Sequence, residues 1–387
     1  MSARRKKDEL EDEPPPPPLP HKNPELVGQG AAEARLLGAW RSGRLPHAWL
    51  LQGPRGIGKA TLAYRMARFV LAGGPEAGRD EGPGLFGADE VPPSPGSLAL
   101  DPEHPVSRQV AAGAHPDLFV LQRTANPKAR KEAGGKPKLR DEIVVEDARR
   151  VRAFLHKTAV AGGWRVVLVD AADELNRNAA NAILKVMEEP PRKSLILLVS
   201  HAPGRLLPTI RSRCCQLPLH RLASAEVEDL MARHRPEIPT EDRAALAGLA
   251  EGSAGRAFAL ADGGGLALYR EMLDLLQAWP RIDGTALHGL ADRWARDATG
   301  DSFRTGMELL IWWLGRLVHA RAIGQLPQEV VPGEAALLAR LGDRPRLEQW
   351  LALWEKVSRL LARAGALNLD RKQVVLTAFF ELEAMTG

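Results

Sequence analysis

The sequence predicts an α/β domain with a parallel sheet, followed by an all-α region. Short apolar runs without alternation are typical of strands that are buried on both faces. Such runs are residues 49–51, 118–121, 166–169 and 195–199. Helical spacing of apolar residues separates them, at about 62–70, 146–157 and 176–188. Strands that alternate with helices predict a doubly wound sheet, in which a ligand binds at the carboxyl ends of the strands.

The chain has no strand-like runs after about residue 222, and helical spacing dominates from there to the end. We expect a small helical unit over 223–265 and a set of longer helices over 266–387. One predicted helix near the end carries an apolar face, which core packing explains best and a subunit interface explains second best. This face consists of Leu347, Trp350, Leu351, Trp354 and Leu361.

The composition indicates a globular protein of two or three domains, since the chain has 387 residues. It contains no run of about 20 apolar residues that could span a membrane, and its charged start is not a secretory signal. The two cysteines, Cys214 and Cys215, are adjacent and make no disulfide framework, which fits a reducing cytoplasm. The net charge of +5 permits an anionic partner such as DNA without requiring one.

Three segments do not read as packed structure. Residues 1–22 are charged and contain an unbroken run from Pro14 to Pro18, so we expect a passive disordered or polyproline tail. Residues 73–97 are rich in Gly and Pro, and residues 124–141 are rich in Lys and Arg. The basic segment is expected to be a solvated insertion, and contact with DNA phosphates is the alternative.

A glycine-rich loop between the first predicted strand and helix carries the strongest motif. Residues 53–61 match the phosphate-loop pattern G-x-x-x-x-G-K-[ST], except that Ala60 takes the hydroxyl position. In such loops the backbone N–H groups cradle phosphates and the Lys reaches the β- and γ-phosphates.

Gly53, Gly56, Gly58 and Lys59 keep this phosphate cradle. Ala60 cannot ligate Mg²⁺, and Thr61 is rotated by about 100° around the helix. We therefore expect ATP, ADP or phosphate to bind without hydrolysis.

A second residue typical of ATPases is missing at the end of the strand predicted over 166–169. Asp170 takes the place of a metal-associated acid, although it could also cap the next helix. The next residue, Ala171, stands where many ATPases carry a catalytic Glu. Asp173 and Glu174 follow, and a shift of two or three residues is expected to point them elsewhere.

With the phosphate loop, the stretch from Asn176 to Pro191 resembles the clamp-loader branch of the AAA+ ATPases. Further similar motifs are Asn23–Gln29, Arg44–Ala48 and Thr209–Cys214. The resemblance covers roughly 23–222, and implies a small helical lid over 223–265 and a helical oligomerisation collar over 266–387. The missing catalytic residues, and the phrase Asn368–Lys372, look most like delta-prime subunits of the bacterial DNA polymerase III clamp loader.

The resemblance also implies roles for single residues. Arg213, in Ser212–Arg213–Cys214, matches an arginine finger that reaches the ATP of a neighbouring subunit, and Arg211 competes for this role. Ser200 matches a position that senses the γ-phosphate. Gly252–Arg256 resembles a second sensor segment, with its Arg displaced by one position.

Relatives usually carry a four-cysteine zinc module, but no cysteine occurs between Gly53 and His115. His104 and His115 cannot build a tetrahedral site by themselves, so neither zinc nor another metal site is expected.

The function that this resemblance implies is a non-hydrolysing subunit of a hetero-pentameric clamp loader. Its partners would be the ATPase subunits, the clamp-opening subunit, the sliding clamp and primer-template DNA, in the cytoplasm. An active AAA+ ATPase, as a clamp-loader motor or a helicase loader, is the alternative; it would need Thr61 to rescue metal binding and another acid to replace Ala171. A small-molecule P-loop kinase is a third and weaker option.

Overall fold

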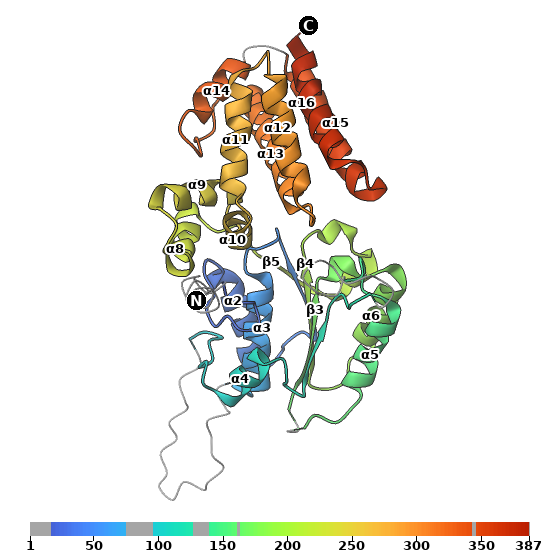
Figure 1. The fold of residues 1–387 in the computed structure, drawn as a ribbon. Coiled ribbons are helices and arrows are strands. Elements are labelled where there is room, and N and C mark those ends of the chain that lie inside the picture. Colours follow the sequence, from blue (N-terminus) through green and yellow to red (C-terminus); the bar gives the residue numbers. More distant parts are fainter. Residues whose placement is uncertain (1–16, 75–95, 127–138, 161–162, 343–345, 387) are drawn as a thin grey trace, which may run out of the picture. The chain divides into compact units, whose positions relative to one another are not determined.

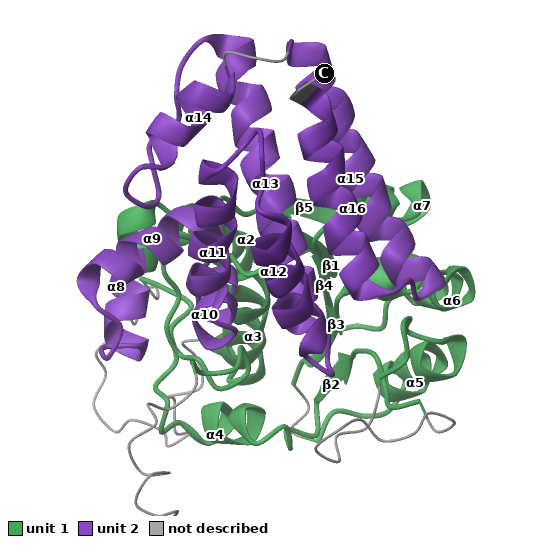
Figure 2. Cartoon of the chain, turned by 45° about the horizontal axis from the view of Figure 1, so that its top comes forward, with its two compact units in different colours: residues 1–227, 252–255 green, residues 228–251, 256–387 purple. Residues whose placement is uncertain are grey.

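The computed structural model describes residues 17–74, 96–126, 139–160, 163–342 and 346–386. The contacts divide the chain into two compact units, residues 1–227 with 252–255, and residues 228–251 with 256–387 (Figures 1 and 2). Most of the tail and most of both insertions predicted from the sequence lie outside the described residues.

Unit 1 is built on a five-stranded parallel sheet in the order β2-β3-β4-β1-β5. The strands are β1 (Ala48–Gln52), β2 (Leu118–Leu121), β3 (Arg165–Asp170), β4 (Ser194–Ser200) and β5 (Cys215–Pro218). The predicted parallel sheet is thereby confirmed. The edge strand β5 was missed, because Gln216 and Pro218 are exposed and its sequence shows no apolar run.

Helices cover both faces of this sheet, which explains why its strands lack alternation. In β4, Leu195, Leu197 and Val199 pack into the core beneath α3, while Ile196 and Leu198 pack into the core beneath α6. The helices of unit 1 are α2 (Gly30–Arg41), α3 (Lys59–Leu71), α4 (Pro105–Ala111), α5 (Val145–Leu155), α6 (Arg177–Glu188) and α7 (Pro208–Arg213). Two short 3-10 turns are η2 (Ala172–Glu174) and η3 (Pro203–Arg205).

Unit 2 is entirely helical in its described part, and the boundary between the units falls within α8 (Ser224–His234). Its helices are α9 (Thr240–Ala250), α10 (Ala254–Asp262), α11 (Gly265–Gln277), α12 (Gly284–Arg296), α13 (Asp301–Ile323), α14 (Glu334–Gly342), α15 (Leu347–Leu367) and α16 (Arg371–Glu383), followed by η4 (Ala384–Thr386). The predicted all-α character of the C-terminal region is confirmed.

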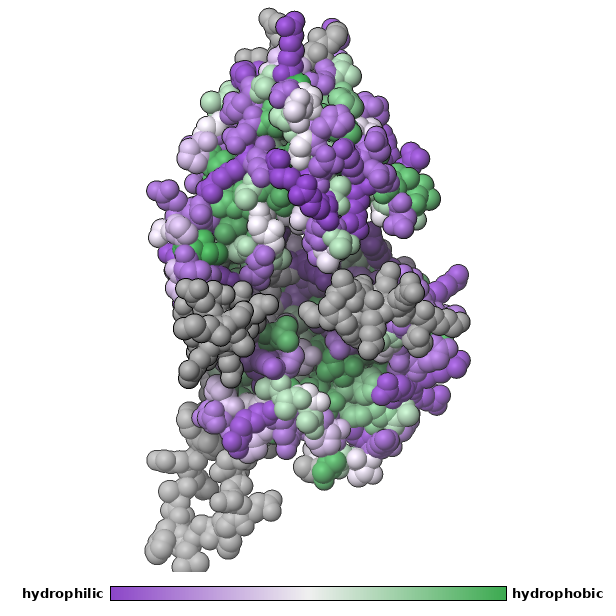
Figure 3. All heavy atoms as spheres, viewed as in Figure 1, coloured by the Kyte–Doolittle hydropathy of each residue, from purple (hydrophilic) through white to green (hydrophobic). Residues whose placement is uncertain are grey.

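Tryptophans fill the core of unit 2. Trp294, Trp313 and Trp350 are fully buried. The apolar face predicted on α15 is only partly a core face, since Trp350 is buried whereas Leu351 is 42% exposed. On the face drawn in Figure 3, hydrophilic and hydrophobic side chains are interspersed over this unit. None of the described helices is long and apolar enough to cross a membrane.

A buried polar cluster connects α11, α13 and α14. The Glu334 carboxylate is 1% exposed and accepts a hydrogen bond from the Tyr269 hydroxyl at 2.6 Å. Arg316 pairs with the same carboxylate at 3.2 Å, and the backbone N–H of Val330 donates to it at 2.7 Å. Burial raises the pKa of Tyr269, and the contact with Glu334 adds to this rise. Because a buried carboxylate is costly unless it is paired, this cluster fixes how the three helices pack.

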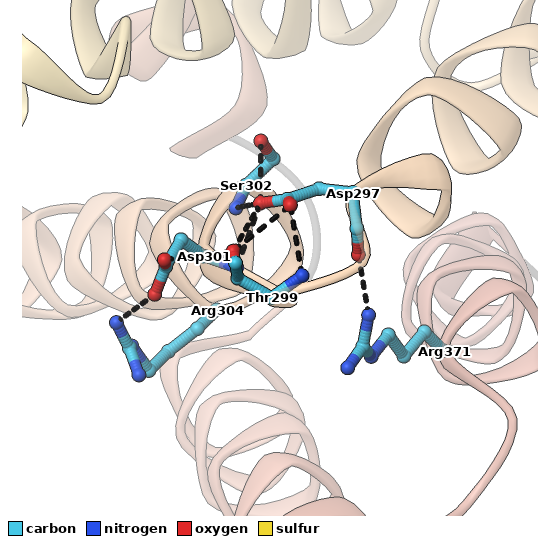
Figure 4. Close-up of polar contacts among 6 residues, drawn as sticks. All are labelled: Asp297, Thr299, Asp301, Ser302, Arg304 and Arg371. Carbon is cyan, nitrogen blue, oxygen red and sulfur yellow. Dashed lines mark hydrogen bonds and ion pairs between the residues drawn. The ribbon is translucent and has the colours of Figure 1, made fainter. Parts of the chain in front are cut away.

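The loop between α12 and α13 is organised by Asp297 (Figure 4). Its carboxylate accepts hydrogen bonds from the hydroxyl and backbone N–H of Thr299 and from the backbone N–H groups of Asp301 and Ser302. The hydroxyl of Thr299 and these backbone groups lower the pKa of Asp297 to about 2. The guanidinium of Arg371 donates to the backbone carbonyl of Asp297 at 2.6 Å, which attaches the start of α16 to this loop.

The phrase Asn368–Lys372 forms the turn between α15 and α16. Asn368 ends α15 in the left-handed conformation, with φ of 55°, and Asp370 caps α16 by accepting from the N–H of Gln373. Lys372 pairs with Asp292 of α12 at 2.7 Å. The phrase therefore has a structural role inside unit 2, because its polar residues end one helix, begin the next and attach both to α12.

Candidate functional site

The glycine loop follows β1 and leads into α3, at the carboxyl end of the strand. Gly53, Gly56 and Gly58 have φ values of 147°, 78° and 98°, which side chains rarely adopt. A Cβ atom on Gly53 would also lie 2.7 Å from the backbone carbonyl oxygen of Leu219. The spacing of the glycines is thus explained by the conformation of the loop itself.

Lys59 is turned into this loop rather than outward. Its side chain is buried, and Nζ donates to the carbonyl oxygens of Gly53, at 2.7 Å, and of Pro54. Burial lowers the pKa of Lys59 to about 8, although the nearby carboxylates of Asp173 and Asp170 act in the opposite direction. The loop carbonyls therefore take the place that phosphate oxygens occupy in a loaded phosphate loop.

The segment Gly252–Gly255 packs against the same loop and belongs to unit 1. The hydroxyl of Ser253 donates to the carbonyl of Arg55 at 2.8 Å, and the N–H of Gly255 donates to the carbonyl of Gly56 at 3.0 Å. A Cβ atom on Gly255 would lie 2.8 Å from the Cα of Gly56. The segment that resembles a second sensor thus contacts the glycine loop, while Arg256 belongs to unit 2.

Asp170, at the end of β3, lies in the electrostatic field of this loop. Burial is the main cause that raises its pKa, and the neighbouring Glu174 adds to this, whereas Lys59 and Arg55 oppose it. Ala171 is buried and Thr61 lies buried within α3. The charges of Asp170 and Lys59 therefore influence each other at the end of the glycine loop.

Asp173 overturns one expectation, because it points toward the site and not away from it. Its carboxylate accepts hydrogen bonds from the Ser200 hydroxyl, at 2.6 Å, and from the backbone N–H of His201. The 3-10 turn η2 brings the chain back toward the end of β4, a reversal that counting residues along the sequence could not show. The neighbouring Glu174 instead pairs with Arg123 at 2.9 Å.

Ser200 and His201 complete this corner of the sheet. Ser200 is the last residue of β4, where the sequence places it, and it is fully buried. Burial, together with the charge of Lys59, lowers the pKa of His201 to about 4, so the imidazole is neutral at physiological pH. Among the described residues, no group of His, Cys, Asp or Glu side chains is arranged to hold a metal ion.

Arg213 lies in the last turn of α7, and its contacts are with Glu188 and Thr209 rather than with the glycine loop. Its Nη2 atom lies 2.9 Å from Oε1 of Glu188, and Nη1 donates to the carbonyl of Thr209 at 3.3 Å. The side chain is 40% exposed. Arg211 is half-buried and donates to the carbonyl of Pro203 at 3.5 Å. Of the two arginines that compete for the finger role, Arg213 is the more exposed.

Sequence reasoning missed a basic groove between α5 and α6, with a volume of about 780 Å³. Its polar lining consists of Arg149, Arg152, His156, Asn178, Asn181 and Lys185. Arg149 and Arg152 of α5, and His156 directly after it, recur at helical spacing, which could have revealed one charged face. Only the packing of α5 beside α6 brings Lys185 and the two Asn side chains to the same groove.

Comparison with known proteins finds that part of this chain is similar to subunits of DNA polymerase III. Residues 97–223 match the family model described as "DNA polymerase III, delta subunit". The chain is 38% identical over 207 residues to the DNA polymerase III subunit delta' of Pseudomonas aeruginosa, covering 54% of this chain and 53% of that protein. It is 32% identical over 232 residues to the Escherichia coli subunit delta', covering 59% and 58%. The resemblance to delta-prime subunits is thereby confirmed.

These matches have a limited extent, since the chain spans about half the length of the curated relatives it matches. It is also 31% identical over 215 residues to the gamma/tau subunit of Mycobacterium tuberculosis, covering 55% of this chain and 31% of that protein. A solved DNA polymerase III gamma subunit-related protein of Thermotoga maritima covers 91% of this chain and 100% of its own, with 16% identity and a TM-score of 0.40.

Proposed function

We propose that this chain is a delta-prime-type subunit of a DNA polymerase III clamp loader, which does not hydrolyse ATP and completes the ATP site of a neighbouring subunit. One contrast carries the proposal. The chain's own nucleotide site lacks a hydroxyl at Ala60 and a carboxylate at Ala171 and is closed over Lys59, while Arg213 is exposed.

The losses at Ala60 and Ala171 act on different parts of hydrolysis. A hydroxyl in the position of Ala60 ligates Mg²⁺, which neutralises charge on the phosphates. A carboxylate in the position of Ala171 orients the attacking water. Asp173 does not replace it directly, because its two oxygens accept from Ser200 and from the N–H of His201.

Arg213 would supply charge to the neighbour's site. A guanidinium that is held near the transferred phosphoryl group stabilises the charge that develops on its oxygens. The exposed position at the end of α7 supports this role, since a finger must reach beyond its own chain.

The glycine loop would still hold ATP, ADP or phosphate without hydrolysing it. Gly53, Gly56, Gly58 and Lys59 would hold the phosphates, with Thr61, Asp170 and Ser200 lining the site. Binding would require Nζ of Lys59 to exchange its bonds to Gly53 and Pro54 for bonds to phosphate oxygens. We therefore expect weak binding. Denaturing the purified chain and measuring the ATP, ADP or phosphate that it releases shows which of these ligands the chain retains.

The proposed partners are the ATPase subunits, the clamp-opening subunit and the sliding clamp, with primer-template DNA reached through the complex. The groove between α5 and α6 is the surface that we assign to DNA phosphates, because its arginines and lysine favour anions. A cytoplasmic location is part of this proposal.

Co-purification with clamp-loader subunits of the same organism, followed by ATPase measurements, tests the function. We expect the chain to enter the complex and to show no turnover by itself. A chain that purifies without any of those subunits would contradict the proposal.

An active ATPase remains the second candidate, and the proximity of Asp173 to Lys59 favours it. The isolated chain decides between the two functions. Turnover above background that Lys59→Ala abolishes would replace the first proposal with the second.

A further inference from the structure

The guanidinium of Arg213 is held by a residue from another helix. Glu188 is the last residue of α6, and its Oε1 atom lies 2.9 Å from Nη2 of Arg213. Within α7, the carbonyl of Thr209 accepts a second bond from Nη1 at 3.3 Å. The strand β4 lies between the two helices in the sequence, so this contact exists only in the folded chain.

The stability of the fold does not explain an acid in this place. The carboxyl end of a helix carries a partial negative charge, which favours cations and disfavours carboxylates. The side chains of Arg213 and Glu188 are 40% and 48% exposed. Exposed ion pairs contribute little to the stability of a fold. The effect of Glu188 is therefore to be sought in what it does to Arg213.

We propose that Glu188 is a positioning residue for Arg213, an inference that rests on the finger role proposed above. A guanidinium has five N–H donors, and the bonds to Glu188 and Thr209 use two of them. The remaining three can face a phosphoryl group. Fixing a long side chain before the neighbour's ATP arrives removes part of the ordering entropy from the reaction step.

If Glu188 instead held the finger away from ATP, its removal would change the ATPase rate in the opposite direction. A carboxylate that only competed with phosphate would slow the reaction, and its removal would raise the rate. A positioning carboxylate is needed for the reaction, so its removal lowers the rate.

The experiment uses the full chain inside the assembled complex and measures kcat and KM of the complex ATPase. Glu188→Gln keeps the size of the side chain and removes its charge. We expect kcat at the one site that Arg213 completes to fall about tenfold with KM for ATP unchanged, and Glu188→Asp to recover part of the loss. The matched control is Glu189→Gln, next in the chain and also exposed, which should leave kcat unchanged.

Combining Glu188→Gln with Arg213→Ala tests whether one residue acts through the other. If Glu188 acts through Arg213, its substitution has no further effect in the Arg213→Ala background. A further loss in that background, or a lowered melting temperature of Glu188→Gln, would show a structural role and overturn the inference.

The two proposals fail in distinguishable ways. An unchanged or raised kcat for Glu188→Gln, beside a slow Arg213→Ala complex, overturns the positioning role alone. An unchanged rate for Arg213→Ala overturns the finger and, with it, the proposed function.

Discussion

The glycine loop and the end of α7 lie in the same unit, yet they differ in how their cations are placed. Lys59 is 3% exposed and bonds to carbonyls of its own loop, while Arg213 is 40% exposed and is held by one carboxylate and one carbonyl. A buried cation whose bonds are made inside the chain must give up those bonds before it can act on another molecule. An exposed cation with donors left over can act on another molecule.

Among the tests of this comparison, Arg213→Ala in the assembled complex should have the largest effect. We expect hydrolysis at the one ATP site that Arg213 completes to fall by about 10³-fold, as for other NTPases that lose an arginine finger. Hydrolysis by a complex in which only that site is catalytically active measures this, with circular dichroism to verify the fold.

Two controls make this result specific. Arg211→Ala removes the half-buried neighbour, and Lys59→Ala removes the cation of the closed loop. Each should change the rate of the complex less than threefold. A loss after Lys59→Ala as large as that after Arg213→Ala would remove the distinction between the two regions.

The pH dependence of stability tests whether Lys59 is buried as a cation. Its pKa is lowered from 10.5 to about 8, so between these values the unfolded state binds more protons than the folded state. Stability must therefore rise with pH in this window, and the penalty of the buried charge is fully present below pH 8. We expect wild type to gain about 3 kcal/mol relative to Lys59→Met between pH 7.5 and 10.5.

Urea unfolding of both chains at several pH values measures this difference. Both chains share every other titrating group, so the contributions of groups that Lys59 does not influence cancel; the pKa values of Asp170 and His201 depend on Lys59. Parallel stability curves would show that Lys59 is solvated in the folded state.

A substitution in the glycine loop tests whether its closed conformation supports the fold. Gly53→Ala places a Cβ atom 2.7 Å from the carbonyl oxygen of Leu219 at a φ of 147°. We expect a loss of about 2 kcal/mol in the free energy of unfolding. Gly38→Ala is the matched control, because a Cβ atom there meets nothing within 4 Å inside α2 and should stabilise the chain slightly. Equal unfolding midpoints for both variants would count against a structural role of the loop.

The smallest effect concerns the groove between α5 and α6. Arg152→Ala should weaken binding of the complex to primer-template DNA about fivefold and reduce the salt dependence of binding by about one unit of slope. Fluorescence anisotropy at several salt concentrations measures both. Arg150→Ala serves as the control, since Arg150 pairs with Asp147 and does not line the groove. Equal weakening by both variants would indicate a general charge effect.

The fold was predictable where both faces of an element are buried. The runs at 166–169 and 195–199 became β3 and β4, because continuous apolar sequence fits a strand between two layers of helices. The strand β5 was not predictable in this way, since it lies at the edge of the sheet and two of its four residues are exposed.

The candidate site was predictable only where backbone chemistry restricts the residue type. Gly53, Gly56 and Gly58 could be identified because their positive φ values require glycine, and Lys59 because of its fixed place after them. Asp173 could not be placed correctly, since the turn η2 reverses the chain and carries its carboxylate to Ser200.

By itself the sequence determined the parallel sheet, the glycine loop and the helical C-terminal region, because these depend on burial patterns and backbone conformation within short segments. Only the tertiary structure decided that Lys59 bonds to its own loop, that Gly255 packs on Gly56 and that Glu188 holds Arg213. The two contacts of Gly255 and Glu188 join residues that are far apart in the chain or separated by a strand. No local pattern encodes them, because their distances are set by how helices and strands pack.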